Sequence, residues 1–505
     1  MDDDKKNPAE KQIENSQSPE IPKPIFESVP TDESQSNLGE NIKPEEVSPE
    51  IETPLPDEIN NPVTQMPSDA PPVMYEENKS KYLVIIGGVI FFIIVLFFIL
   101  KMVFGGKSAP KEVNLVYWGL WEDKQVLTPL IDQYRQKNPH VKIDYQKMAP
   151  QEYRERLIAR TKNGQGPDIF RFHNTWLPEI TEITSQLPSS IMSNSDFEKT
   201  FYKVHQKDLK VGNYYYGLPL EIDGLVLIYN SNLLKKAGIQ TAPATWDDLT
   251  DSVTKLTVKD KQGSIITAGI ALGTTSNIEH YSDIFTLMLM QNGGNIKRLD
   301  QPEAAGALEI YRKFAESPQN FWDDNMSNSL TAFIQEKVAM IIAPSWEVLV
   351  IKSANPDIEV KVAAVPSVPG SDPVSIANYW VEGVSKASRN QTEAWKFLRF
   401  LVEKDNLTKL YEIQTRSRLF GEPYSRVDMA SLLVQNEYIG PVIKQAESFV
   451  SSPSIMRTYD NGLNDEINKY IENAINSTIQ GVSYSEALKT AMQGITQVLN
   501  KYKIE

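Results

Sequence analysis

The sequence predicts an α/β fold that follows a polar N-terminal segment and one long apolar helix. Three observations lead to this prediction: strand and helix patterns alternate from residue 113 to 172, residues 82–100 carry no charge, and acidic residues concentrate before them. The chain has 505 residues and a net charge of −15, of which residues 1–81 contribute −12.

The first 81 residues are acidic and rich in proline. They contain 13 of the 32 prolines and only two aromatic residues. Such a segment cannot bury enough apolar surface to offset its ordering entropy, so we expect a disordered tail over residues 1–81. A solvated spacer is the simplest role for this tail, and docking of a partner is the alternative.

The apolar segment that follows is long enough to cross a bilayer. Residues 82–104 are interrupted only by Lys101 and would extend about 34 Å as a helix, against about 30 Å of hydrocarbon. The apolar side chains run all round this helix, and a signal peptide would be shorter and nearer the N-terminus. We therefore expect a transmembrane anchor at 82–104 and a linker at 105–111, although flanking lysines give no clear orientation.

Composition excludes several kinds of chemistry. The chain has no cysteine, which excludes disulfides, thiolate catalysis and a lipid attached to cysteine. Beyond the tail the net charge is only −3, so we expect no nucleic-acid partner. The four histidines lack the spacing of metal ligands on a helix, and we expect no metal and no cofactor.

The region after the linker alternates between strand and helix patterns. We expect strands at 113–117, 141–145 and 168–172, with amphipathic helices at 126–134 and 151–163 between them. This order implies a parallel sheet covered on both faces.

The rest of the chain continues as α/β and ends in helices. Buried strands are expected at 225–230 and 338–343, and Thr245 opens a helix with a capping box. The last third is strongly helical, and Ser483 is expected to cap the final helix.

Several short sequences then appear in an order that resembles a known family. They are YWGLWED, GQGPDIF, YYYGLPLEIDGLVLIYNSNLLKKAGI, PATWDDL, MQNGGNI, FIQEKVAMIIAPSW and EAWKFLRFLVEKDN. None is specific alone, but their order over residues 112–505 resembles extracellular solute-binding proteins of the maltose-binding type, the receptors of ABC sugar importers. The resemblance implies a two-lobed, periplasmic-binding-protein-like α/β fold that holds ligand in the cleft between its lobes.

The resemblance also implies where the lobes begin and end. The chain would cross between them in hinge segments near residues 222–225, 372–378 and 420–425. The first lobe would take about 112–222 and 376–422, and the second about 225–372 and 425–505.

The side chains that the resemblance places at the cleft are aromatic rings, carboxylates, amides and one imidazole. They are Trp121, Glu122, Asp123, His173, Asn174, Trp176, Glu221, Asp223, Trp346, Asn378, Tyr379, Trp380 and Tyr459. Flat aromatic rings cover the C–H faces of a sugar, and carboxylates and amides bond its hydroxyls. An aspartate–arginine pair that several relatives have near Thr175 and Trp176 is missing here.

The tryptophans divide into ligand-facing and core positions. Trp121 follows a glycine in a loop and Trp346 follows a buried strand, so both are expected to face ligand. Trp118 ends a strand and is expected to be packed, and Trp246 and Trp395 lie on amphipathic helices and are expected in the core.

Together these inferences predict a membrane-tethered, extracytoplasmic and monomeric receptor that delivers a sugar or oligosaccharide to ABC permease subunits, with its tail in the cytoplasm and no catalytic residue. Two other classes stay open. One is a surface-anchored glycan-degrading enzyme that uses Glu221 or Asp223 as acid or base. The other is a ligand-sensing receptor that signals through its tail. Turnover of a bound sugar would favour the enzyme, and a neighbouring kinase gene would favour the sensor.

Overall fold

The structure is a computed structural model that describes residues 79–104, 111–456 and 461–504, with side chains in the first of these ranges described for 85–97. The predicted tail lies outside the described residues as far as residue 78, and so do residues 105–110 of the predicted linker and Tyr459.

The apolar segment forms a single helix, α1 (Lys79–Phe104). Every large apolar side chain described in it, from Ile85 to Phe97, is exposed. Among the residues that the structure describes, no helix is both long and apolar enough to span a membrane.

The first lobe is built on a five-stranded sheet in the order β2-β1-β3-β13-β6. Its strands are β1 (Val113–Gly119), β2 (Val141–Lys147), β3 (Ile169–His173), β6 (Leu218–Pro219) and β13 (Trp380–Val384). β1 is parallel to β2 and β3, as predicted. β13 was not predicted, and it runs antiparallel between β3 and β6 because the chain returns to this sheet from the other lobe.

Helices and a small hairpin complete the first lobe. They are α2 (Lys124–Lys137), α3 (Tyr153–Lys162), α4 (Leu177–Ile180), α5 (Asn194–Thr200), α6 (Lys203–Asp208), β4 (Lys210–Val211), β5 (Tyr214–Tyr215), α13 (Gln391–Leu401) and α14 (Lys404–Gln414). The predicted helical stripe of α2 is buried from Leu127 to Tyr134. Trp118 and Trp395 are buried in this lobe, which confirms both predictions.

The second lobe has its own five-stranded sheet, in the order β11-β7-β10-β9-β8. Its strands are β7 (Leu225–Asn230), β8 (Val258–Lys259), β9 (Ile265–Ile270), β10 (Val338–Pro344) and β11 (Val360–Ala363). β7 is antiparallel to both of its neighbours, and β10 is parallel to β9. The predicted strands 225–230 and 338–343 are confirmed.

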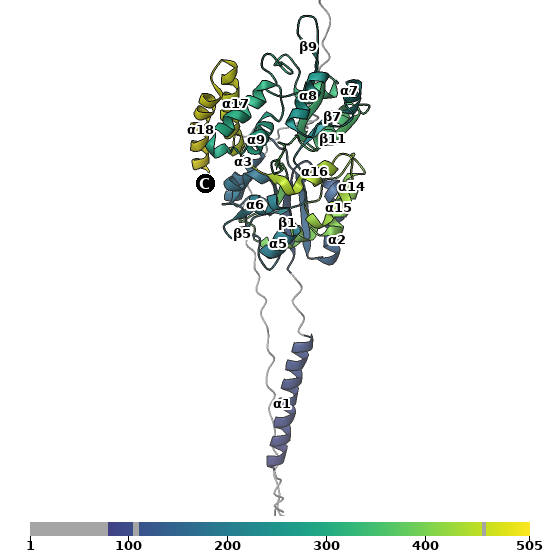
Figure 1. Cartoon of the computed structure of the whole chain (residues 1–505). Coiled ribbons are helices and arrows are strands. Elements are labelled where there is room, and N and C mark those ends of the chain that lie inside the picture. The colour runs from purple at the N-terminus through teal and green to yellow at the C-terminus, as the bar shows by residue number, and fades with distance from the viewer. Residues whose placement is uncertain (1–78, 105–110, 457–460, 505) are drawn as a thin grey trace, which may run out of the picture. The chain divides into compact units, whose positions relative to one another are not determined.

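The helices of the second lobe cover this sheet. They are α7 (Ser231–Lys236), α8 (Trp246–Leu256), α9 (Tyr281–Gln291), α10 (Pro302–Lys313), α11 (Ser329–Ile334) and α12 (Glu347–Ala354). The capping box of Thr245 and Asp248 is present at the start of α8. Trp246 is only half-buried, and its Nε1–H donates to Gln291 Oε1 over 2.6 Å. Figure 1 shows β7, β11 and α8 at one end of this part of the chain, with β1, α2 and α5 at the other.

Short extended segments connect the two sheets. Isolated bridges pair Glu221 with Tyr424 and Gly224 with Ala377. Beside them β12 (Ser375–Ile376) runs parallel to β14 (Phe449–Val450). These pairings lie where the chain passes between the two sheets, and we call this set of crossing segments the hinge.

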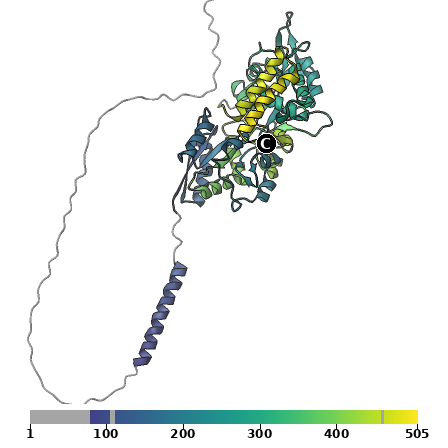
Figure 2. The ribbon, with the colours of Figure 1, turned by 90° about the vertical axis from the view of Figure 1, so that its left-hand side faces the viewer.

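The end of the chain is helical, as predicted. The helices are α15 (Ala430–Leu433), α16 (Gly440–Gln445), α17 (Leu463–Ile479) and α18 (Tyr484–Lys501). Ser483 caps α18 by accepting the backbone N–H of Glu486. α17 and α18 pack on each other and on α9 and α10, and Figure 2 shows the pair in yellow along the second lobe.

Candidate ligand-binding site

An aromatic cluster forms where strands of the first sheet end. Trp121 follows β1, His173 ends β3, Trp176 lies in the 3-10 turn η2 (Asn174–Trp176), and Trp380 begins β13. The ring of Trp380 meets those of Trp121, His173 and Trp176 edge-on, at centroid distances of 5.6, 5.2 and 5.3 Å. The carboxyl end of β1 and β3 thus gathers four of the predicted site residues at one edge of the sheet, the position where open α/β folds hold ligands.

Only one ring of this cluster offers a large free face. Trp121 is 41% exposed, and its backbone has a φ of 60°, in the left-handed region that turns the chain sharply after β1. Trp176 and Trp380 are buried, and the Arg154 guanidinium lies 5.0 Å from the ring of Trp176. Trp121 is therefore the ring of this cluster that a ligand can cover directly.

A buried chain of hydrogen bonds runs from the cluster into the second lobe. His173 Nε2 lies 2.9 Å from Asn378 Oδ1, and the Asn378 amide donates to Asp283 Oδ2 over 3.2 Å. Burial lowers the pKa of His173 to about 4, so the ring is neutral near pH 7. Its Nδ1 accepts the backbone N–H of Thr175, which leaves the proton on Nε2 to donate to Asn378. The chain links η2 of the first lobe to α9 of the second.

Trp346 lies in the second lobe, after β10. It precedes α12, and its ring is 6.4 Å from that of His280, centroid to centroid. His280 Nε2 lies 3.2 Å from Glu347 Oε1. Burial alone would lower the pKa of His280, but the hydrogen bond and charge of Glu347 outweigh burial, and the pKa lies above its usual value. Sequence analysis missed His280 and Glu347, although both flank helix starts that follow strands of the second sheet.

Two predicted carboxylates lie in the hinge. The Glu221 carboxylate accepts the backbone N–H of Trp380 over 2.9 Å, and Asp223 Oδ2 accepts the hydroxyl of Ser345 over 2.8 Å. Burial raises the pKa of Asp223 to about 7. Burial, with the nearby charge of Glu422, also holds the pKa of Glu221 well above its usual value. Glu221 thus bonds the hinge to the first sheet through Trp380. Asp223 bonds it to the second lobe, because Ser345 follows β10.

Asn174 and Tyr379 meet at a different carboxylate. Asp208 accepts hydrogen bonds from the Asn174 amide, the Tyr379 hydroxyl and the Ser451 hydroxyl at 2.9, 2.8 and 2.6 Å. Tyr379 is fully buried. Both side chains are thus committed to an internal polar network near the hinge.

Glu122 and Asp123 have partners away from the aromatic cluster. Buried Glu122 accepts from Gln414 over 3.0 Å and from Arg418 over 3.3 Å, and burial beside Glu422 raises the pKa of Glu122 to about 7. Exposed Asp123 pairs with Lys147 over 2.8 Å. Among the described residues, no hydrogen bond joins either carboxylate to the cluster of tryptophans.

Within the described ranges, no group of three or more histidine, aspartate and glutamate side chains is arranged to hold a metal ion.

The fold consists of two sheets joined by the hinge, and both lobes contribute polar and aromatic side chains. These features define a two-lobed ligand-binding protein. Residues 118–407 match the family described as bacterial extracellular solute-binding protein, and this chain belongs to that family. The predicted family is therefore confirmed.

Relatives and solved structures agree with this assignment. The chain is 21% identical over 324 residues to the multiple sugar-binding protein of Streptococcus mutans, covering 61% of this chain and 75% of that protein. It is 25% identical over 274 residues to a maltodextrin-binding protein of Bacillus subtilis, covering 51% of this chain and 61% of that one. A cyclo/maltodextrin-binding protein complexed with maltotetraose matches with a TM-score of 0.63 and 21% identity, covering 78% of this chain and 99% of that chain. The structural match confirms the predicted two-lobed fold.

These relatives are binding proteins rather than enzymes, which supports a role without catalysis.

Proposed function

We propose that this protein is a carbohydrate receptor of an ABC importer, in which the two lobes close around a sugar or oligosaccharide. The observation that carries the proposal is the exposed ring of Trp121 in the first lobe, together with Trp346 and the His280–Glu347 pair in the second. An aromatic face and hydrogen-bonding groups on opposite lobes are what a pyranose ring needs to be bound on two sides. The names of relatives that bind multiple sugars or maltodextrin support this ligand class.

The predicted site residues then take three roles in the proposal. Trp121 and Trp346 contact the sugar, and Trp380 packs edge-on against the ring of Trp121. His173, Asn378, Glu221 and Asp223 couple that contact to the hinge, because their hydrogen bonds join one lobe to the hinge or to the other lobe. Five more residues support the first lobe through burial, hydrogen bonds or an ion pair: Glu122, Asp123, Asn174, Trp176 and Tyr379. Tyr459 is retained as a proposed aromatic contact.

Binding is tested by titrating the full-length protein with a panel of neutral oligosaccharides while following tryptophan fluorescence. Maltotetraose, mannotriose, cellotetraose and xylotetraose make a suitable panel, and the protein should be held in a detergent without a sugar head group. We expect at least one probe to change the emission, and Trp346→Ala to weaken that response. Replacement of exposed Leu432 by alanine is the matched control. A protein that responds to none of these sugars but does respond to a peptide or a metal would refute the proposal.

The same proposal includes a membrane anchor at residues 82–104, with the ligand-binding lobes outside the cell, the tail inside, and a single receptor chain docking on permease subunits. The unbroken apolar sequence of 82–100 and the exposure of the described apolar side chains of α1 support it. Protease added to intact cells should digest the lobes and leave the tail protected. Digestion of the tail with residues 112–505 protected would overturn this topology.

A further inference from the structure

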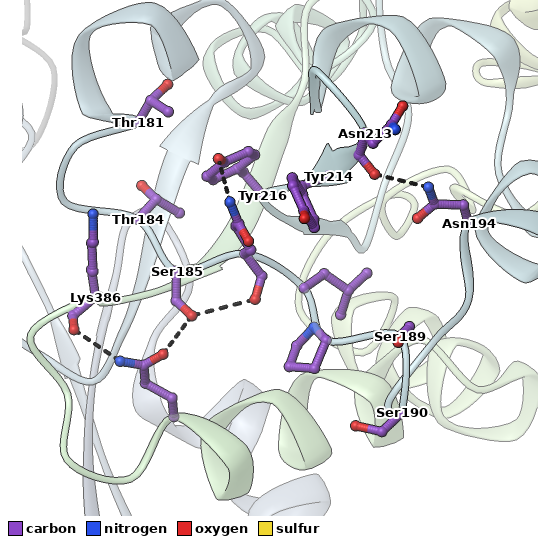
Figure 3. A pocket seen from close by; sticks show the side chains of 14 residues that line it. Thr181, Thr184, Ser185, Ser189, Ser190, Asn194, Asn213, Tyr214, Tyr216 and Lys386 are labelled. Atoms are coloured by element: carbon purple, nitrogen blue, oxygen red, sulfur yellow. Dashed lines mark hydrogen bonds between the residues drawn. The ribbon is translucent and has the colours of Figure 1, made fainter.

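A concave site lies in the first lobe, away from the hinge. It is a pocket of about 820 Å³ that we call the Tyr214 pocket (Figure 3). Its lining comes from the loop after α4, the β4–β5 hairpin and the segment before α13: Thr181, Thr184, Ser185, Gln186, Leu187, Pro188, Ser189, Ser190, Asn194, Asn213, Tyr214, Tyr216, Lys386 and Gln391. Its volume falls in the range of about 300–1,000 Å³ typical of small-molecule sites.

The Tyr214 pocket is separate from the ligand site proposed between the lobes. The backbone N–H of Ser185 donates to Val384 O over 2.7 Å, at one end of β13. Trp380, which meets the aromatic cluster, lies at the other end of the same strand. Four residues of strand separate these ends by about 13 Å. No residue of the pocket lining belongs to the predicted cleft.

The polar groups of the pocket wall are held in place by hydrogen bonds. The Gln186 amide donates to the Tyr216 hydroxyl over 3.1 Å, and the Ser185 hydroxyl donates to Gln391 Oε1 over 2.6 Å. On the far side, the Asn194 amide donates to the backbone carbonyl of Asn213 over 2.9 Å. Figure 3 shows these bonds around the opening. Because these groups are already ordered, a ligand would not have to order them on binding.

The chemistry of the lining suits a hydroxyl-rich ligand that carries no positive charge. Among the described residues that line the pocket, hydroxyls and amides predominate, lysine is represented once by Lys386, and there is no carboxylate. A cation would therefore find no opposite charge. Tyr214 is 52% exposed and offers an aromatic face, while Ser189 and Ser190 place exposed hydroxyls on the same rim. An aromatic face beside hydroxyls, amides and one ammonium matches the C–H face and hydroxyl edge of a sugar.

We propose that the Tyr214 pocket binds a neutral oligosaccharide independently of the cleft between the lobes. Such a site would hold a glycan chain at the surface of the receptor whether or not the cleft is filled. The inference does not depend on which ligand the cleft takes.

The test measures binding of the same four oligosaccharides to full-length protein by calorimetry and saturation-transfer NMR. Three variants are compared in the wild-type and Trp346→Ala backgrounds: Tyr214→Ala, Gln186→Ala and the control Leu432→Ala. Tyr214, Gln186 and Leu432 are all exposed, so these variants should fold normally. We expect Tyr214→Ala to weaken one binding event by about tenfold in both backgrounds, Gln186→Ala to weaken it less, and Leu432→Ala to leave it unchanged.

The outcomes separate this inference from the function proposed for the cleft. Binding that is lost with Trp346→Ala but insensitive to Tyr214→Ala overturns the pocket and keeps the cleft. Binding that is sensitive to Tyr214→Ala but not to Trp346→Ala keeps the pocket and counts against the cleft. If no probe binds in any background, or if Tyr214→Ala and Leu432→Ala behave alike, the pocket is not a carbohydrate site.

Discussion

Replacing Trp121 by alanine should weaken carbohydrate binding by an amount that its exposed surface sets. A tryptophan buries at most about 250 Å², so an exposed fraction of 41% leaves about 100 Å² for a ligand to cover. At about 25 cal/mol per Å², covering half to all of that surface contributes about 1.2 to 2.5 kcal/mol. Since about 1.4 kcal/mol is a factor of ten in affinity, Trp121→Ala should raise Kd roughly eight- to sixtyfold.

The measurement is a calorimetric titration of the full-length protein with whichever neutral oligosaccharide binds the wild type. Trp121→Phe keeps a smaller ring at the same position and should lose only part of the affinity, while Leu432→Ala should lose none. Equal affinity of the wild type and Trp121→Ala would refute the reasoning, because the free face of the cluster would then not touch the ligand. A loss far above a hundredfold would also contradict it, since the exposed area cannot supply so much.

Three further predictions concern the hinge and the buried charges. Burial raises the pKa of Asp223 from its usual 3.8 to about 7, so between about pH 4 and pH 7 the folded chain keeps a proton that the unfolded chain releases. Stability against urea should therefore fall as pH rises through this window, and Asp223→Asn should make that fall less steep. Equal slopes for the wild type and the variant would count against the pKa shift. The Arg171 side chain pairs with Glu382 over 2.6 Å, and both are buried. Arg171→Met should therefore lower the free energy of unfolding in urea by about 3–5 kcal/mol, and adding Glu382→Gln should recover part of that loss. A loss below about 1 kcal/mol would contradict this reasoning. The Asn464 amide donates to Thr175 Oγ1 over 2.8 Å across the lobes. Asn464→Ala should therefore increase the radius of gyration of the ligand-free protein in X-ray scattering. An unchanged radius of gyration would show that this bond does not hold the lobes together.

Local patterns were predictable because residues close together in the sequence decide them. The stripe of α2 and the capping box of α8 depend only on residues within one turn or two of each other, and both are present. The position of β13 is different, because its five residues join the first sheet only after the chain has passed through the second lobe. The sequence of a strand does not indicate which distant strand it pairs with. The first sheet was therefore predicted to be parallel, but the antiparallel β13 makes it mixed.

The site was predictable as a location but not as a set of contacts. Position after a strand was enough to bring Trp121, His173 and Trp176 together at one sheet edge. The partners of each side chain depend on burial, which the resemblance did not supply. Tyr379 is an example: its hydroxyl is taken by Asp208, 171 residues earlier in the chain. His280 was not predicted as a candidate site residue, because its carboxylate partner, Glu347, is 67 residues away in the sequence.

Hydrogen bonds between the lobes contribute to the free energy difference between the arrangements of the lobes that a ligand can shift. Asn378 donates to Asp283 and Asn464 donates to Thr175, and each such bond contributes about 0.5–1.5 kcal/mol net. Two of them together contribute about 1–3 kcal/mol to holding the lobes as they lie in this structure, which is comparable to the contribution worked out for Trp121. A ligand that touched the first lobe alone would bind the open and closed forms equally and would shift neither. Only a ligand that also contacts the second lobe can shift the lobes, and Trp346 is one of the proposed contacts there. Trp346→Ala should therefore reduce the sugar-induced change in radius of gyration, while Trp121→Ala should only raise the sugar concentration at which the change occurs.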